Sequence, residues 1–320
     1  MTHFKATHEP FDYPERLKDL YNDIEIPEPA SLYDFGPQTT GRSFVGQKLE
    51  NLGKRWEAYA KNPDTFWTKY PGPLFSSQGL DSITLRKKIY QKFIKDFLRC
   101  GAAIDENIGR ILDYLETSGL ADNTVIIYTA DQGYFLGEHG FFDKRMIYEE
   151  SLRMPFVICY PKEIKCGTHI DDIVLNSDFA ALFADYAGIK KPSFIQGESF
   201  RENLKGKTPK KWKSEMYYRY WEHSPDRPGH FGIRNKNYML AFFYGQPLGM
   251  KGASAQTTTP AWEFYDLQKD PKELHNAIND KKYQKTIHKM KVDLLKLREE
   301  LGDTDKDQPI MKEIIDSYYW

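Results

Sequence analysis

The sequence predicts an α/β fold that ends in a small antiparallel sheet covered by a helix, and three features indicate it. From Thr84 to Gly119, apolar residues recur at three- and four-residue spacing, which is the mark of an amphipathic helix. The apolar, β-branched run Thr124–Thr129 follows this helix. Short aromatic segments separated by Gly- and Pro-rich turns fill the chain after Gly197. A helix followed by a buried strand is typical of an α/β layer.

The first eighty residues precede all of these patterns and show almost no sustained periodicity. Pro and Gly are scattered among aromatic residues over this whole stretch. Long segments without regular structure in a compact domain are usually functional excursions or cover another part of the fold. We therefore expect this segment to wrap over another part of the protein without forming regular elements of its own.

The run Thr124–Thr129 is apolar on both faces, which is typical of a central strand in a parallel sheet that helices cover. Pro155–Tyr160 predicts a second buried strand by the same pattern. Asn176–Asp178 has the composition of a helix start, and Gly188 is the expected end of that helix. These elements predict a second strand–helix unit in the same layer.

The change in residue pattern after Gly197 predicts two regions. We expect residues 1–205 to form the α/β part and residues 206–320 to form a small α+β subdomain. The aromatic segments predict an antiparallel sheet, and the last amphipathic pattern predicts a helix that covers it. The strands are expected at Met216–Trp221, Phe231–Arg234, Tyr238–Tyr244 and Trp262–Leu267, and the helix over about Lys282–Leu301.

Composition excludes several classes of protein. Lys and Arg total 45 against 46 Asp and Glu, spread along the chain, so we expect no nucleic-acid partner. No stretch approaches the roughly eighteen apolar residues that a membrane span needs, so none is expected. The three cysteines include no Cys-x-x-Cys pair, which indicates neither a disulfide framework nor a zinc knuckle. Cys100 and Cys159 lie in apolar patterns and are predicted to be buried.

The densest polar cluster begins just after the strongest predicted strand, at Asp131. Ligands in open sheets bind beyond the carboxyl ends of the strands, so this position favours a functional site. Asp131 and Gln132 offer a carboxylate and an amide oxygen, which are ligands suited to Ca²⁺ or Mg²⁺. A hard cation needs about six or more oxygens, so the others would come from elsewhere. The alternative, that Asp131 only caps the turn at Gly133, stays open.

Two further positions are candidates for handling an anion. Lys144 follows a Gly-rich loop and could direct its ammonium at an anion on the metal, and Arg145 could do the same. The alternative is that both are solvated loop cations. His8 stands beside a Pro-set turn and could donate a proton to a leaving group or a hydrogen bond to an anion. It could equally be an ordinary surface histidine.

Five stretches, taken together and in their order along the chain, carry a resemblance to one family. Lys5–Phe11 is similar to Lys-Ala-Pro-His-x-Pro-Phe, and Asp105–Leu112 to an Asp-x-Asn-x-Gly helix. Phe264–Glu273 is similar to a closing Leu-Tyr-Asp-Leu-x-x-Asp-Pro-x-Glu motif. The remaining two are Thr129–Gly140 and Lys144–Glu150. The chain thus resembles the C-terminal half of a type I sulfatase of the alkaline-phosphatase-like superfamily, in particular the bacterial carbohydrate and glycosaminoglycan sulfatases.

The resemblance implies a role for each candidate residue. Asp131 and Gln132 match the positions where these enzymes hold calcium. Lys144 matches a lysine that binds the sulfate, and His8 a histidine that contacts the sulfate or the leaving oxygen, so both are expected to be catalytic. His230 and Arg234 lie in a segment similar to the edge of the substrate pocket in carbohydrate sulfatases. They are therefore expected to bind substrate.

The chain also departs from the family pattern. Family members form their nucleophile, formylglycine, from a Cys in a Cys-x-Pro/Ala-x-Arg stretch, and two aspartates near the N-terminus complete the metal shell. None of the three cysteines has that context. The resemblance therefore implies an alkaline-phosphatase-like sulfatase fold lacking its N-terminal part, with formylglycine in the missing segment and no activity in this chain alone.

The expected function is that of a sulfuric ester hydrolase acting on a sulfated carbohydrate with calcium and formylglycine. Aromatic faces stack on sugar rings, so the Tyr-, Trp- and His-rich stretch Tyr217–Arg234 favours a saccharide substrate. Two alternatives remain, a phosphatase or phosphodiesterase of the same superfamily and a truncated, non-catalytic fragment. The resemblance implies a periplasmic, extracellular or lysosomal location. The particular sugar, the sulfated position and the oligomeric state are not predicted.

Overall fold

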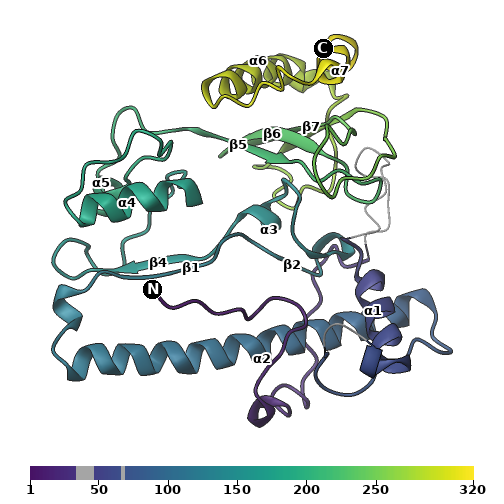
Figure 1. The fold of residues 1–320 in the computed structure, drawn as a ribbon, viewed down its shortest axis with the longest axis vertical. Coiled ribbons are helices and arrows are strands. Elements are labelled where there is room, and N and C mark those ends of the chain that lie inside the picture. The colour runs from purple at the N-terminus through teal and green to yellow at the C-terminus, as the bar shows by residue number, and fades with distance from the viewer. Residues whose placement is uncertain (34–46, 66–68) are drawn as a thin grey trace. The chain divides into compact units, whose positions relative to one another are not determined.

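A computed structural model describes residues 1–33, 47–65 and 69–320, which divide into two compact units (Figure 1). Within these ranges, the first unit consists of 1–33, 47–65, 69–124 and 135–143, and the second of 125–134 and 144–320. No helix in the described ranges combines the length and the apolar composition needed to cross a membrane.

The first unit is built on a long helix, α2 (Ser82–Thr117) (Figure 1). The Asp81 carboxylate caps its start by accepting hydrogen bonds from the backbone N–H groups of Ile83 and Thr84. Gly119 follows the helix with a φ of 69°, a conformation that glycine adopts at least cost. The predicted helix and its end are thereby confirmed.

A second helix, α1 (Leu49–Lys61), contradicts the expectation that the first eighty residues form no regular elements. Leu49, Leu52 and Trp56 lie on one stripe of this helix and are buried. A Cβ at Gly53 would lie 2.6 Å from Ile89 Cδ1 on α2, so the two helices approach closely there. The expectation was wrong because the apolar stripe is narrow and the other faces of α1 are polar.

Short elements complete the first unit. They are the 3₁₀ helices η1 (Glu15–Leu17), η3 (Pro63–Thr65), η4 (Ala121–Asn123) and η5 (Glu138–Gly140), and the strands β2 (Phe135–Leu136) and β3 (Phe142–Asp143), which pair antiparallel.

In the second unit, β1 (Ile126–Thr129) pairs antiparallel with β4 (Phe156–Cys159) in a two-stranded sheet. The prediction of a parallel sheet is wrong for the described residues, because an apolar run indicates burial but not the direction of the neighbouring strand. One face packs on a core that contains Leu182, Phe200 and Leu204. The other face carries Tyr128 and Val157, whose exposed fractions are 43% and 63%. Cys159 is also exposed, contrary to its predicted burial.

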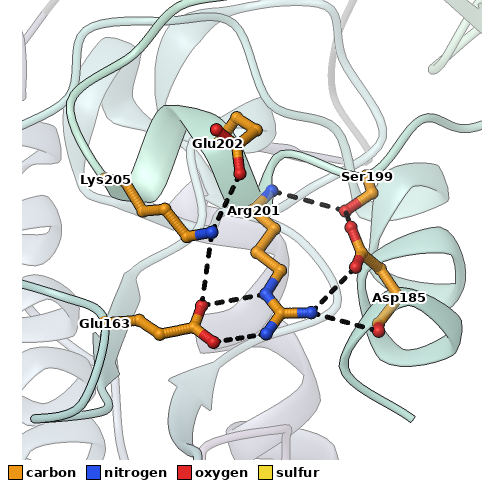
Figure 2. Close-up of polar contacts among 6 residues, drawn as sticks. All are labelled: Glu163, Asp185, Ser199, Arg201, Glu202 and Lys205. Atoms are coloured by element: carbon orange, nitrogen blue, oxygen red, sulfur yellow. Dashed lines mark hydrogen bonds and ion pairs between the residues drawn. The ribbon is translucent and has the colours of Figure 1, made fainter. Parts of the chain in front are cut away.

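The core on the β1–β4 pair comes from two helices. The 3₁₀ turn η6 (Asn176–Asp178) leads into α4 (Phe179–Tyr186), and Gly188 follows with a φ of 67°, as predicted. A shorter helix, α5 (Arg201–Leu204), supplies Arg201. Figure 2 shows this guanidinium between Glu163, which follows β4, and Asp185 of α4. Its Nε lies 2.9 Å from Glu163 Oε2, and its Nη1 lies 2.9 Å from Asp185 Oδ1. The ion pairs therefore join three segments of the unit.

The predicted antiparallel sheet is confirmed, with the strand order β5-β6-β7-β8. Its inner face packs under α6 (Gln284–Glu300), which follows η7 (Lys281–Tyr283) (Figure 1). A further helix, α7 (Pro309–Tyr318), was not predicted, although Pro309 at its first turn is a helix-start signal. The strands are β5 (Glu215–Tyr220), β6 (His230–Asn235), β7 (Tyr238–Phe243) and β8 (Ala261–Asp266).

We predict that Arg201→Gln lowers the free energy of unfolding by about 1–2 kcal/mol, because the substitution removes hydrogen bonds to two carboxylates at once. Urea denaturation followed by circular dichroism measures the change. Lys207→Gln removes an exposed cation of the same segment and should change the value by less than about 0.5 kcal/mol. Equal effects of the two substitutions would contradict the prediction.

Candidate active site

The two candidate metal ligands lie in the loop directly after β1. Asp131 is exposed and Gln132 is half-buried. The backbone of the loop is held in place, since Asn176 Nδ2 donates to the Asp131 carbonyl at 3.1 Å and the Gly133 N–H donates to the Ser151 carbonyl at 3.0 Å. A Cβ at Gly133 would lie 2.2 Å from the Glu150 carbonyl oxygen. Only glycine therefore lets this loop lie against the short helix α3 (Glu149–Leu152).

The fit of these residues to a hard cation is partial. Asp131 and Gln132 provide a carboxylate and an amide oxygen, which are the donor types that Ca²⁺ prefers. Across residues 1–33, 47–65 and 69–320, no three His, Cys, Asp or Glu side chains gather into a metal-binding cluster. Asp131 and Gln132 would thus supply two of the roughly six or more oxygens that a hard cation needs. A bound cation would take the remaining oxygens from other groups.

Lys144 lies beside the same loop. Its Nζ is 5.6 Å from the centroid of the Tyr134 ring, and Tyr134 follows Gln132 by two positions. A cation over an aromatic face is attracted by the ring quadrupole. The structure therefore brings the predicted anion-binding ammonium next to the segment that carries both candidate metal ligands.

His8 belongs to the first unit and is exposed on a firmly held turn. Its Nδ1 donates to the Glu9 carbonyl at 2.8 Å, so the neutral ring has Nε2 as its acceptor. The Glu9 carboxylate in turn pairs with Arg55 at 2.6 Å. Phe11 anchors the other side of the turn, buried against Phe93 with ring centroids 5.3 Å apart. The turn holds the ring with Nε2 available to a ligand.

The loop 144–149 runs along one face of β6. His230, Gly232 and Arg234 alternate on this strand and therefore share that face. A Cβ at Gly232 would lie 2.4 Å from Ile147 Cδ1, so the loop lies directly on the strand. Glu149 reaches Arg234, with Oε2 and Nη2 2.5 Å apart. Ile147 in the middle of the loop and Glu149 at its end thereby fix the loop to β6.

His230 lies at the other end of that face and is fully buried. Its ring stacks on Phe243 at a centroid distance of 4.6 Å and lies beside Tyr218 and Tyr220 of β5. Nδ1 donates to the Pro228 carbonyl at 2.8 Å. The expected substrate contact of His230 stays a prediction.

Arg234 belongs to a buried ion-pair network that the sequence did not predict. Its Nη1 lies 2.7 Å from Oε1 of Glu273, and Oε2 of Glu273 accepts the backbone N–H of Glu149 at 2.7 Å. Burial raises the pKa of Glu273 to about 7, although Arg234 and the backbone hydrogen bond act to lower it. Arg234 thus holds α3 on the sheet, and its expected contact with substrate stays a prediction. The sequence signal that could have indicated this network was Glu273, the last residue of the motif Phe264–Glu273.

Comparisons with known proteins now give the family. Residues 1–189 match the family described as Sulfatase, and residues 137–300 match the family described as N-sulphoglucosamine sulphohydrolase, C-terminal. The first match covers more than half of the chain. The chain therefore belongs to the sulfatase family, as its motifs indicated.

Individual relatives agree with this assignment. An N-acetylglucosamine-6-O-sulfatase of Bacteroides thetaiotaomicron is 34% identical, over 96% of this chain and 59% of its own length. An arylsulfatase of Clostridium perfringens is 27% identical, over 94% and 54%. A protein solved in complex with its substrate D-glucosamine-2-N,6-O-disulfate is 33% identical with a TM-score of 0.81, over 95% of this chain and 65% of its own.

The shared fold reaches beyond sulfatases. A phosphonate monoester hydrolase of Silicibacter pomeroyi superposes with a TM-score of 0.68 at 20% identity. The fold is that of the alkaline-phosphatase-like sulfatases, with the small antiparallel sheet near its C-terminus. The chain spans a little over half of the length of the curated relatives named above.

We predict that Glu273 makes stability depend on pH. Because its folded-state pKa is raised from 4.5 to about 7, its contribution is fully present below about pH 4.5 and is lost as pH rises through about 7. We compare the free energy of unfolding of the wild type with that of Glu273→Gln. The difference, wild type minus variant, should decrease as pH rises from about 4.5 to about 7, by at most about 3 kcal/mol. Urea denaturation at a series of pH values measures it.

The matched control is Glu299→Gln, which changes an exposed glutamate of α6. The corresponding difference for this variant should stay flat from about pH 5.5 to pH 8, because the substitution changes no buried group. A flat difference for Glu273→Gln as well would contradict the prediction.

Proposed function

We propose that this chain carries the charge-neutralising part of a sulfatase active site that hydrolyses sulfate esters of a saccharide. The observation that supports it most is the position of the Lys144 ammonium beside the loop of Asp131 and Gln132, at the end of β1. This loop lies within the part of the chain that matches the sulfatase family. A sulfate ester carries negative charge on its oxygens, and this arrangement directs a cation and potential metal ligands to one place.

The proposed chemistry assigns a separate task to each residue. Asp131 and Gln132 would hold Ca²⁺, with Mg²⁺ as the alternative, and a bound divalent ion would neutralise charge on the sulfate oxygens. Lys144 would bind a sulfate oxygen through its ammonium and stabilise the charge that develops there. His8 would donate a proton from Nε2 to the departing sugar oxygen, a step for which the ring must first be protonated.

The nucleophile is proposed to come from residues outside these 320. Formylglycine in this family forms within a Cys-x-Pro/Ala-x-Arg stretch, and Cys100, Cys159 and Cys166 all lie in other contexts. The 320-residue chain alone should then release no sulfate, whereas the native gene product that includes such a stretch should release it.

The proposed substrate class is a sulfated, glucosamine-containing saccharide. Two relatives at 33–34% identity support this class by their names, one as an N-acetylglucosamine-6-O-sulfatase and one by its complex with a glucosamine disulfate. Tyr218 and Tyr220 add an aromatic surface beside His230, and aromatic rings of this kind pack well against sugar rings.

We predict that Lys144→Ala in the native gene product lowers kcat for glucosamine-6-sulfate by about 10²–10³-fold, because one preorganised positive charge at the sulfate is lost. Ion chromatography of the released sulfate measures the rate. Lys165→Ala removes an exposed lysine elsewhere in the second unit and should leave the rate unchanged. Hydrolysis of phosphate esters but not of sulfate esters would replace the sulfatase assignment with the phosphatase alternative.

Calcium binding is tested separately by isothermal titration calorimetry on the native gene product, because two aspartates of the metal shell are expected outside these 320 residues. Asp131→Asn should weaken binding about tenfold or more, because it removes a charged ligand. Asp122→Asn, which changes an exposed aspartate of the first unit, should not alter it. Equal calcium affinity of wild type and Asp131→Asn would refute the proposed metal site.

A further inference from the structure

An open pocket of about 610 Å³ lies in the second unit, at the start of β5 and the turn between β6 and β7. Its walls come from three segments, 172–173, 208–215 and 235–237. Among the described residues, those that line the pocket include no member of the loops that carry Asp131 and Lys144. The proposed function therefore does not use this pocket.

Side-chain hydrogen bonds join the first two walls of the pocket. Thr208 Oγ1 donates to Asp172 Oδ2 at 2.6 Å, and Trp212 Nε1 donates to the Ile173 carbonyl at 2.9 Å. The backbone N–H of Trp212 also donates to the Pro209 carbonyl at 2.9 Å. These contacts fix both walls in the absence of a ligand, and a pre-formed site loses less conformational entropy when a ligand binds.

The third wall is the turn between β6 and β7, and it is held by a side chain of its own. Asn235 Oδ1 accepts hydrogen bonds from the backbone N–H groups of Asn237 and Tyr238, each at 2.9 Å. Glu215 pairs with Asn235 in the register of β5 and β6, so the turn is a direct neighbour of the wall that leads into β5. Lys236, in the middle of this turn, is therefore presented from a defined backbone position.

Two lysines bring positive charge to the pocket from different walls. Lys210 and Lys236 both line it, are exposed, and form no ion pair with any residue of the described ranges. Lys213 also lines the pocket, but its Nζ pairs with buried Asp178 at 2.6 Å. Five of the nine residues 205–213 are lysine and none is acidic, although the whole chain has a net charge of −1. Lysine-rich runs of this kind are typical of surfaces that bind polyanions.

The other groups that line the pocket are suited to a sugar. The Ser214 hydroxyl and the Asn237 side-chain amide form no hydrogen bond with a residue in the described part of the chain. Asp172 and Glu215 add carboxylates, which repel a bare anion but accept hydrogen bonds from sugar hydroxyls. Trp212 adds apolar surface, on which the C–H groups of a sugar ring can pack. The pocket therefore fits a saccharide that carries negative charge better than it fits a small anion.

We infer that this pocket is a second saccharide site, which binds part of a sulfated saccharide chain without hydrolysing it. Lys210 and Lys236 pair with sulfate groups, since an ammonium and a sulfate oxygen form a charge-assisted hydrogen bond. Asn237, Ser214 and the two carboxylates bind the sugar hydroxyls. The choice of a sulfated chain as the ligand rests on the proposed function, whereas the pocket and its charges do not. The inference extends the proposed function from a single sulfate ester to a longer chain that the protein holds at a further place.

The test is isothermal titration calorimetry with a sulfated heparin tetrasaccharide, in calcium-free buffer. The native gene product carries Lys144→Ala, so that turnover and binding at the proposed active site are suppressed. We expect saturable binding of the sulfated tetrasaccharide and much weaker binding of the unsulfated tetrasaccharide with the same backbone. Equal affinity for the two, or no binding of either, would overturn the inference. Binding of inorganic sulfate, or of a single-stranded DNA of equal charge, as tight as that of the sulfated tetrasaccharide would overturn the assignment to a saccharide.

The double variant Lys210→Gln/Lys236→Gln should weaken binding of the sulfated tetrasaccharide about fivefold or more, because it removes two charge-assisted contacts. The matched control is Lys285→Gln/Lys312→Gln, which removes the same charge from exposed lysines of α6 and α7 and should bind like the parent protein. Asn237→Ala leaves the charge unchanged and should also weaken binding. Equal losses in both double variants would show a general effect of net charge and would overturn the assignment to this pocket.

The outcome is separable from that of the proposed function. With Lys144 restored, Lys210→Gln/Lys236→Gln should leave kcat for glucosamine-6-sulfate unchanged, because this small substrate does not need the pocket. Absent sulfate release by the native gene product, with binding that still depends on Lys210 and Lys236, would count against the proposed function alone. Normal sulfate release, with a double variant that binds the sulfated tetrasaccharide as tightly as its parent, would count against the second saccharide site alone.

Discussion

The arrangement of the candidate site depends on the close approach of the loop 144–149 to β6. A side chain at Gly232 would overlap Ile147 and the carbonyl oxygen of Leu240, at 2.4 and 2.6 Å from the added Cβ. Since the loop lies directly on the strand, Glu149 meets Arg234 at one end. At the other end of the loop, Lys144 lies beside the loop that carries Asp131. The sheet therefore positions the segment of the predicted sulfate-binding lysine through the packing of the Ile147 side chain on the strand at Gly232.

Charge is distributed differently at the two ends of this strand. At the Arg234 end, Glu149 and Glu273 surround a single guanidinium, and buried charges of this kind are stable when they are paired. At the His230 end, burial and then the charge of Arg227 lower the pKa of Arg145. The first end thus holds the fold together.

Elements with strong periodicity were predicted well from the sequence. The long helix α2, the antiparallel strands β5 to β8 and the helix α6 are confirmed, because one face of each buries a regular apolar pattern. The helix α1 was missed, since its apolar stripe is only a few residues wide. The pairing of β1 with β4 was predicted in the wrong direction, because the path of the intervening chain sets direction and local pattern does not.

By itself, the sequence determined the family, the strongly periodic elements and the residues Asp131, Gln132, Lys144 and His8 as candidates, because motifs and periodicity are local properties of the chain. Only the tertiary structure decided which side chains meet. Glu273 reaches Arg234 across 39 positions, and Glu149 reaches the same Arg234 across 85. Such contacts depend on how strands and loops pack together. The separation of two residues along the chain does not determine the distance between them in space.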